Sequence, residues 1–230
     1  MSKAFFVDTT RCTACRGCQV ACKEWKGLKP GMTKQTGTHQ NPPDLNAVTP
    51  KLVRFSEHMI DGKVEWFFFP DQCRHCVAPP CLDVADIYVE GAVIQDEKTN
   101  AVLYTDKIRQ LTKEQFEEMR EACPYNIPRR DDETGEVMKC DMCHDRVVNG
   151  LLPMCVKTCP TGTMNFGEAE DMMELATKRL AEVKKKWPKA SLIDYRDVNV
   201  IYLVVEEQEK YGVFVADRSP VGLNPKLGLA

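Results

Sequence analysis

The sequence predicts an α+β protein with small antiparallel sheets, short helices and a C-terminal extension made of a helix and a strand. Two observations point to this class. Short runs of β-branched and aromatic residues flank two-residue turn signals such as Asp61-Gly62, which is typical of antiparallel hairpins. Closer to the C-terminus, a helical pattern over residues 168–187 is followed by a continuous apolar run over 198–205.

The first part of the chain is expected to hold most of the short elements. Short strands are predicted at residues 52–57, 64–69, 87–89, 92–95 and 101–104. After them, Thr112 and Gln115 form a capping box, and Leu111 with Phe116 supplies the matching hydrophobic staple. We therefore expect a helix that runs from this point to about Ala122.

The C-terminal extension begins with the longest expected helix, over residues 168–187. Its acidic start and basic end suit the helix dipole, and Pro188 ends it. The apolar run at 198–205 is expected to be a buried strand. Two segments are expected to lack regular structure: the polar stretch 27–50, read as a long surface loop, and the tail from Ser219, read as disordered or as an arm against another subunit.

Composition excludes several classes of function. The chain has 230 residues, a net charge of −3, 43% hydrophobic and 28% charged residues, as expected for a globular protein that presents no basic field to nucleic acid. Apolar runs such as 66–69 and 201–205 are far shorter than the ~20 residues that a membrane-spanning helix needs. The N-terminus runs directly into the first cysteine motif, so we expect no signal peptide in this chain.

The twelve cysteines are the unusual feature, and three interpretations compete. Disulfide frameworks serve short secreted chains, and neighbours as close as Cys12, Cys15 and Cys18 do not suit separate bridges. A zinc-binding structural module would suit Cys-x2-Cys pairs, but four thiolates within residues 12–22 would crowd one tetrahedral ion. Iron–sulfur clusters explain this run directly, because 4Fe-4S ferredoxins use Cys-x2-Cys-x2-Cys-x3-Cys followed by proline. Here Lys23 replaces that proline.

The segment from Cys12 to Lys26, with the stretch from Lys139 through Cys155 to Gly162, resembles the iron–sulfur subunits of tungsten or molybdenum pterin oxidoreductases, and most closely those of formate dehydrogenase. The resemblance implies two interleaved ferredoxin-like modules over residues 1–167, and it implies how the cysteines divide among three 4Fe-4S clusters. Module A comprises about 1–50 plus 136–167, module B about 51–135, and 168–230 is the helix–strand extension with its tail. Cluster one would take Cys12, Cys15, Cys18 and Cys159; cluster two Cys22, Cys140, Cys143 and Cys155; cluster three Cys73, Cys76, Cys81 and Cys123.

The sequence departs from the family at a fourth cluster. Where the family has four further cysteines, this chain has Ala85, Lys113, Phe116 and Met119. All four ligands are missing together. We therefore expect Phe116 and Met119 to point inward and fill the volume that a fourth cluster would occupy.

Several other residues lie beside the cysteines without suggesting catalysis. Basic side chains next to ligands would offset the cluster charge, or they form a solvated face; they are Arg11, Arg16, Lys23, Arg74, Lys139, Arg146 and Lys157. His75 and His144 are expected to lie near the clusters without binding iron, because twelve thiolates already complete three sites. Trp25, Trp66 and Trp187 are expected to serve packing. No residue is assigned a catalytic role.

The resemblance implies an electron-transfer subunit that works with a large catalytic subunit holding a tungsten or molybdenum bis-pterin cofactor for formate oxidation or CO2 reduction. Without a fourth cluster or a membrane helix, the expected electron carrier is diffusible, such as a multihaem cytochrome c. The expected location is the periplasm, reached by export with a signal-bearing partner; a cytoplasmic complex is the alternative. Two other functions remain open: the electron-transfer subunit of another molybdopterin oxidoreductase, such as a sulfur-compound or arsenate reductase, and the zinc module.

Overall fold

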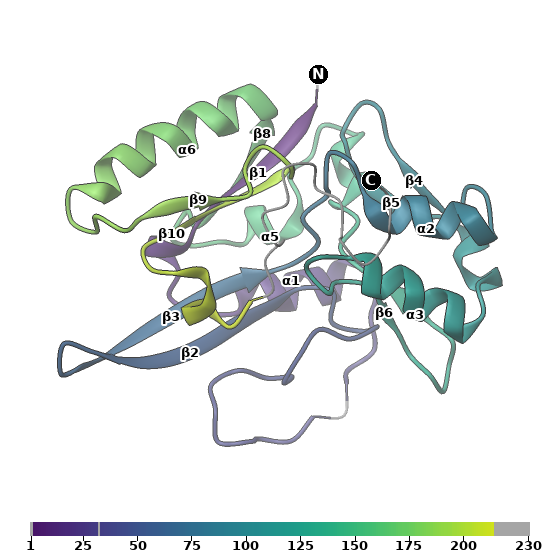
Figure 1. The fold of residues 1–230 in the computed structure, drawn as a ribbon, viewed down its shortest axis with the longest axis horizontal. Coiled ribbons are helices and arrows are strands. Elements are labelled where there is room, and N and C mark those ends of the chain that lie inside the picture. The colour runs from purple at the N-terminus through teal and green to yellow at the C-terminus, as the bar shows by residue number, and fades with distance from the viewer. Residues whose placement is uncertain (1, 32, 214–230) are drawn as a thin grey trace.

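The computed structural model describes residues 2–31 and 33–213, so the expected tail from Ser219 lies outside the described residues. A four-stranded mixed sheet forms one side of the molecule, with the strands in the order β8-β1-β10-β9 (Figure 1). These strands are β1 (Lys3–Asp8), β8 (Met164–Glu168), β9 (Ser191–Ile193) and β10 (Val200–Val204). β1 runs parallel to β10 and antiparallel to β8. The predicted strand at 198–205 is thus confirmed, whereas β1 was not predicted.

The two faces of this sheet bury different partners, because alternate residues of a strand point to opposite sides. Phe6, Ile201 and Leu203 pack with Ala176 and Val183 of α6 (Ala169–Lys184), which lies across the outer face in Figure 1. This confirms the helix predicted at 168–187. Residues of the opposite face pack inward against the base of a long hairpin.

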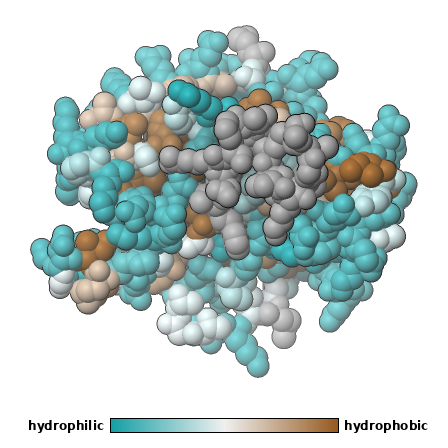
Figure 2. All heavy atoms as spheres, viewed as in Figure 1, coloured by the Kyte–Doolittle hydropathy of each residue, from teal (hydrophilic) through white to brown (hydrophobic). Residues whose placement is uncertain are grey.

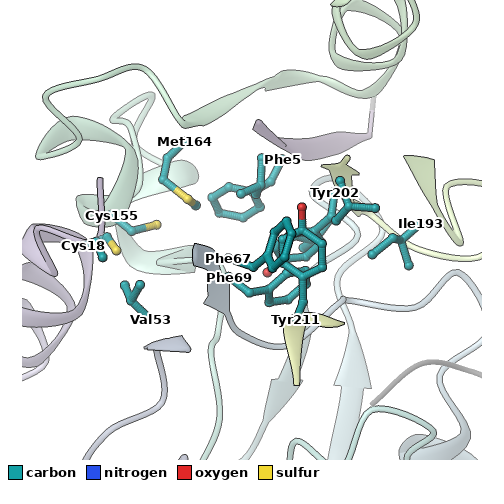
Figure 3. Packing of buried hydrophobic residues seen from close by; sticks show 14 of the residues in the cluster. Phe5, Cys18, Val53, Phe67, Phe69, Cys155, Met164, Ile193, Tyr202 and Tyr211 are labelled. Atoms are coloured by element: carbon teal, nitrogen blue, oxygen red, sulfur yellow. The ribbon is translucent and has the colours of Figure 1, made fainter. Parts of the chain in front are cut away.

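That hairpin consists of β2 (Leu52–Ile60) and β3 (Lys63–Asp71), each longer than predicted. Asp61 and Gly62 both have positive φ, of 50° and 75°, and Ile60 pairs directly with Lys63, which confirms the two-residue turn. At its base, Phe69 stacks on Tyr202 of β10 with ring centroids 4.2 Å apart (Figure 3). Towards its tip the hairpin projects from the body and shows apolar atoms at the surface (Figure 2).

A second cluster of elements lies on the opposite side of the molecule (Figure 1). It contains α2 (Pro80–Tyr88), the antiparallel pair β4 (Val93–Gln95) and β5 (Val102–Tyr104), and α3 (Lys113–Ala122). α3 begins at the predicted capping box, in which Thr112 Oγ1 accepts from Gln115 N and Gln115 Oε1 accepts from Thr112 N. The strand predicted at 87–89 is wrong: Ile87 and Tyr88 end α2, which starts with proline at its first position and packs against α3.

Short elements complete the fold. They are α1 (Gly17–Trp25), β6 (Arg129–Arg130), β7 (Val137–Met138), α4 (His144–Val147), α5 (Met154–Lys157) and three 3-10 turns, Thr9–Arg11, Asp106–Gln110 and Gln208–Tyr211. The described part of 27–50 contains no element longer than an isolated bridge between Asn46 and Thr49, as expected for a loop. Among the described residues, no helix is long and apolar enough to cross a membrane. The boundaries of the two interleaved modules stay a prediction.

Candidate iron–sulfur sites

The cysteine loops share an unusual backbone conformation. All twelve cysteines are free thiols, and none forms a disulfide. Non-glycine residues with positive φ occur in or beside the cysteine motifs, namely Ala14, Arg16, His75, Asn126, Met142 and Cys143. Left-handed backbone is costly for such residues and persists where the surroundings impose it, often at ligand sites. It curls each loop so that backbone amides face its own sulfur: the amides of His75 and Met142 each lie 3.4 Å from the sulfur two residues earlier.

The thiols predicted for cluster one lie together. Burial raises the pKa of the Cys18 thiol, and the negative charges of Cys159 and Cys15 raise it further. Burial also raises the pKa of Cys12 to about 11, with Cys18 and Cys15 contributing in the same direction. Cys159 differs, because hydrogen bonds from the backbone near Thr161 and Met164 outweigh its burial and lower its pKa. Cys15 is exposed, so this set reaches the protein surface.

The other two predicted sets are also brought together. Burial raises the pKa of Cys22, and the next contributions come from Cys140 and Cys143. For Cys155, burial again dominates, and Cys143 and Cys22 are among the thiols that raise its pKa. In the third set, burial raises the pKa of Cys76, followed by the charges of Cys123, Cys73 and Cys81.

The charges of one thiol set also act on the neighbouring set, and these effects link the first set to the second and the second to the third. Cys18 of the first set raises the pKa of Cys155 of the second, and Figure 3 shows these two side chains next to each other. Cys73 of the third set acts in the same way on Cys140 of the second. The second set therefore lies between the first and the third.

This donor set suits iron–sulfur clusters. The described part of the chain holds no three His, Cys, Asp or Glu side chains close enough to bind one metal ion. In a four-iron cube each cysteine binds a different iron, so the thiols of one set need not converge on a point. Burial disfavours the thiolate form of most of these cysteines, and clusters bind thiolates, so cluster binding must release protons. The chain would supply four soft thiolates to each cluster, and the assignment of ligands to clusters stays a prediction.

The expected fourth position is filled by side chains. Ala85 and Met119 are completely buried, Phe116 is 2% exposed, and all three belong to one apolar cluster between α2 and α3. The prediction that Phe116 and Met119 point inward is confirmed. Lys113 lies on the outer side of α3, where its Nζ is 2.8 Å from Asp132 Oδ2.

The basic residues predicted near the ligands divide by burial. Arg74, Lys139 and Arg146 are buried, whereas Arg11 and Lys157 are exposed, and Arg16 and Lys23 are intermediate. Arg74 is held by Asp71 at 2.7 Å and lies over the rings of Phe69, Tyr125 and Tyr202.

The two histidines differ in environment. His75 is fully buried, and its Nδ1 accepts a hydrogen bond from the Val102 amide at 3.0 Å. His144 is only partly buried and lies 3.5 Å from Asp96. Among the tryptophans, Trp25 donates to Asp145 at 2.9 Å and Trp66 is 60% exposed on the hairpin, so Trp66 does not serve packing of the core.

One buried charge near the thiols was not predicted. Lys51 precedes β2, is 2% exposed, and lowers the pKa of the Cys18 and Cys155 thiols against the effect of burial. It lies outside every cysteine motif, and its neighbours come from distant segments. No local signal in the sequence identifies it.

Comparison with known proteins names the family. Residues 64–169 match the family model described as a 4Fe-4S dicluster domain. The chain is 61% identical to formate dehydrogenase 2 subunit beta (cytochrome c-553) of Nitratidesulfovibrio vulgaris, across 92% of this chain and 97% of that protein. It is 54% identical to formate dehydrogenase subunit beta of Megalodesulfovibrio gigas, with the same coverage. It is 40% identical to the formate dehydrogenase-O iron-sulfur subunit of Escherichia coli, across 83% of this chain and 62% of that protein.

These relatives are beta or iron–sulfur subunits of formate dehydrogenases, and two of them match this chain over almost their whole length. The 4Fe-4S interpretation of the twelve cysteines is thereby confirmed, and the zinc module and the other pterin oxidoreductases are set aside. At this level of identity over almost the whole of both chains, the protein belongs to the formate dehydrogenase beta subunits, which relay electrons through 4Fe-4S clusters.

Proposed function

We propose that this chain carries single electrons through three 4Fe-4S clusters between a formate-converting catalytic subunit and a diffusible carrier. The observation that supports it most directly is the linear order of the thiol sets: Cys18 lies in one packed cluster with Cys155, and Cys73 lies in another with Cys140. A row of neighbouring one-electron centres is what a relay requires. Bound clusters would supply the redox chemistry, and the protein supplies thiolates, burial and spacing.

The catalytic subunit is proposed to hold tungsten or molybdenum on a pterin and to dock where the first thiol set meets the surface. The exposure of Cys15 supports this end of the row as the entry point, since it is the one exposed cysteine of the twelve. The clusters would leave no iron open to substrate, because four thiolates complete each cube. Formate chemistry therefore belongs to the partner.

The carrier at the other end is proposed to be a cytochrome c, expected to hold several haems, and the complex is proposed to work in the periplasm. The name of the Nitratidesulfovibrio vulgaris relative includes cytochrome c-553, which supports a cytochrome as carrier. Phe116 and Met119, which are buried, stand in the sequence where the family has ligands of a fourth cluster, so electrons would leave from the third set.

The proposal is tested by purifying the complex anaerobically and adding formate. About twelve irons per chain are expected, and formate should bleach the broad visible absorption of the clusters. Bleaching by dithionite but not by formate would contradict the proposed partner. Cys123→Ala should remove or convert the third cluster alone, and loss of the first cluster in this variant would contradict the ligand assignment.

A further inference from the structure

Lys51 is a buried cation that lacks an acidic partner. Its Nζ donates to Pro70 O at 3.1 Å and to Gln72 Oε1 at 2.6 Å, and both acceptors are neutral. Within the described residues, no carboxylate oxygen lies within ion-pair distance of this ammonium group. Asp71, which pairs with Leu52 across the hairpin, is already held by Arg54 and Arg74 at 2.7 Å each. A buried ammonium group without a counter-charge is costly, so its anionic partner must be sought elsewhere.

The groups that act electrostatically on Lys51 are cysteine thiols from two sets and the Tyr202 hydroxyl. Burial alone would lower the pKa of Lys51, but the charges of Cys18, Cys155 and Cys140 raise it above its ordinary value. Conversely, Lys51 lowers the pKa of Cys12 and Cys18 in the first set and of Cys22 and Cys155 in the second. Val53, two residues after Lys51, belongs to one buried cluster with Cys18 and Cys155, and Figure 3 shows it beside them. The segment that carries Lys51 therefore lies where thiols of the two sets are neighbours.

We propose that Lys51 is the shared internal counter-cation of clusters one and two and raises the reduction potentials of both. This rests on the proposed ligand sets. A cluster with four thiolates is anionic, and reduction adds one further negative charge, so a fixed positive charge nearby favours the reduced form. One electron enters and leaves, no bond is made or broken, and Lys51 keeps its proton throughout.

Two other lysines provide matched comparisons. Lys139 is 4% exposed, lowers the pKa of Cys81 in the third set and has its Nζ 4.9 Å from the centre of the Tyr104 ring. It is a buried cation beside a different cluster. Lys157 lies between Cys155 and Cys159 in the sequence, close to ligands of clusters one and two, but it is exposed, so water screens its charge.

The test is a redox titration of the full chain, purified anaerobically with its clusters and followed by electron paramagnetic resonance. Cys15→Ser, Cys143→Ser and Cys123→Ser assign the signals of clusters one, two and three. In Lys51→Met, the ratio of reduced to oxidised cluster at a fixed potential should fall about tenfold for clusters one and two, which is about 59 mV for a one-electron couple. Cluster three should shift much less.

The control variants have opposite expectations. Lys139→Met should lower the potential of cluster three and leave cluster one unchanged, Lys157→Met should shift none of them appreciably, and Lys51→Arg should restore wild-type potentials. If Lys51→Met does not fold, Lys51→Gln removes the same charge while keeping a polar end. Unchanged potentials in the charge-removing variant, or an equal fall at all three clusters, would overturn the role of Lys51. A wild-type chain that lacks three clusters would instead overturn the ligand sets.

Discussion

The packing that replaces a fourth cluster can be tested by Phe116→Ala. Phe116 is 2% exposed and packs with Ala85 and Met119, and the Arg130 guanidinium lies 5.9 Å from the centre of its ring. Removing a buried phenylalanine costs about 3–5 kcal/mol, because the surroundings collapse only partly into the cavity. In a domain of this size, 1 kcal/mol shifts the Tm by about 2–4 °C, so the expected fall in Tm is roughly 6–20 °C.

The assay is thermal unfolding followed by circular dichroism under anaerobic conditions, with iron content measured before heating. Lys113→Ala is the matched control on the same helix, because its side chain is 64% exposed and contacts only an equally exposed Asp132 in the salt bridge that the structure shows. It should leave the Tm almost unchanged. If Phe116→Ala lowered the Tm no more than this control, α3 would not fill a packed site and the argument would be wrong.

Three further predictions concern the cap, an ion pair and the metal. Thr112→Ala removes the capping box of α3 and should cost about 1 kcal/mol, so an unchanged Tm would contradict the role of the cap. Burial alone would raise the pKa of Asp44, but Arg54 and Arg129 lower it below the ordinary value of 3.8. The stability that the ionised Asp44 carboxylate contributes is therefore lost only as the pH falls below 3.8. Asp44→Asn should therefore reduce stability by about 1 kcal/mol, given its partial exposure, and equally at pH 8 and pH 6; a smaller effect at pH 6 would contradict the assignment. Removing iron with a chelator should lower the Tm sharply, because cluster binding and folding are coupled, and an unchanged melt would refute that coupling.

Local chemistry made several elements predictable. The Asp61-Gly62 turn fixed the register of its hairpin, since both positions require positive φ, and the Thr112 cap marked the start of α3. The position of Phe116 followed from cysteine spacing, because its place in the motif normally holds a ligand. In each case the informative residues are close together in the sequence.

Elements that depend on distant partners were missed or misread. β1 is a strand because it lies between β8 and β10, whose residues come from the far end of the chain. Ile87 and Tyr88 favour strand by propensity, but Pro80 and packing against α3 make them helical. Lys51 was missed for the same reason, since the thiols around it, Cys18, Cys140 and Cys155, come from three separate segments.

The central place of β1 has a consequence for the order of events during synthesis. Phe5 pairs with Val200, so the main sheet cannot close until nearly the whole chain has left the ribosome. At about 5–20 residues per second, that interval is roughly 10–40 s. Such non-local pairing slows folding, because the loop-closure entropy is lost before the contacts form. The first four cysteines likewise wait for partners between Cys140 and Cys159, so clusters one and two are completed later in synthesis than cluster three, whose last ligand is Cys123.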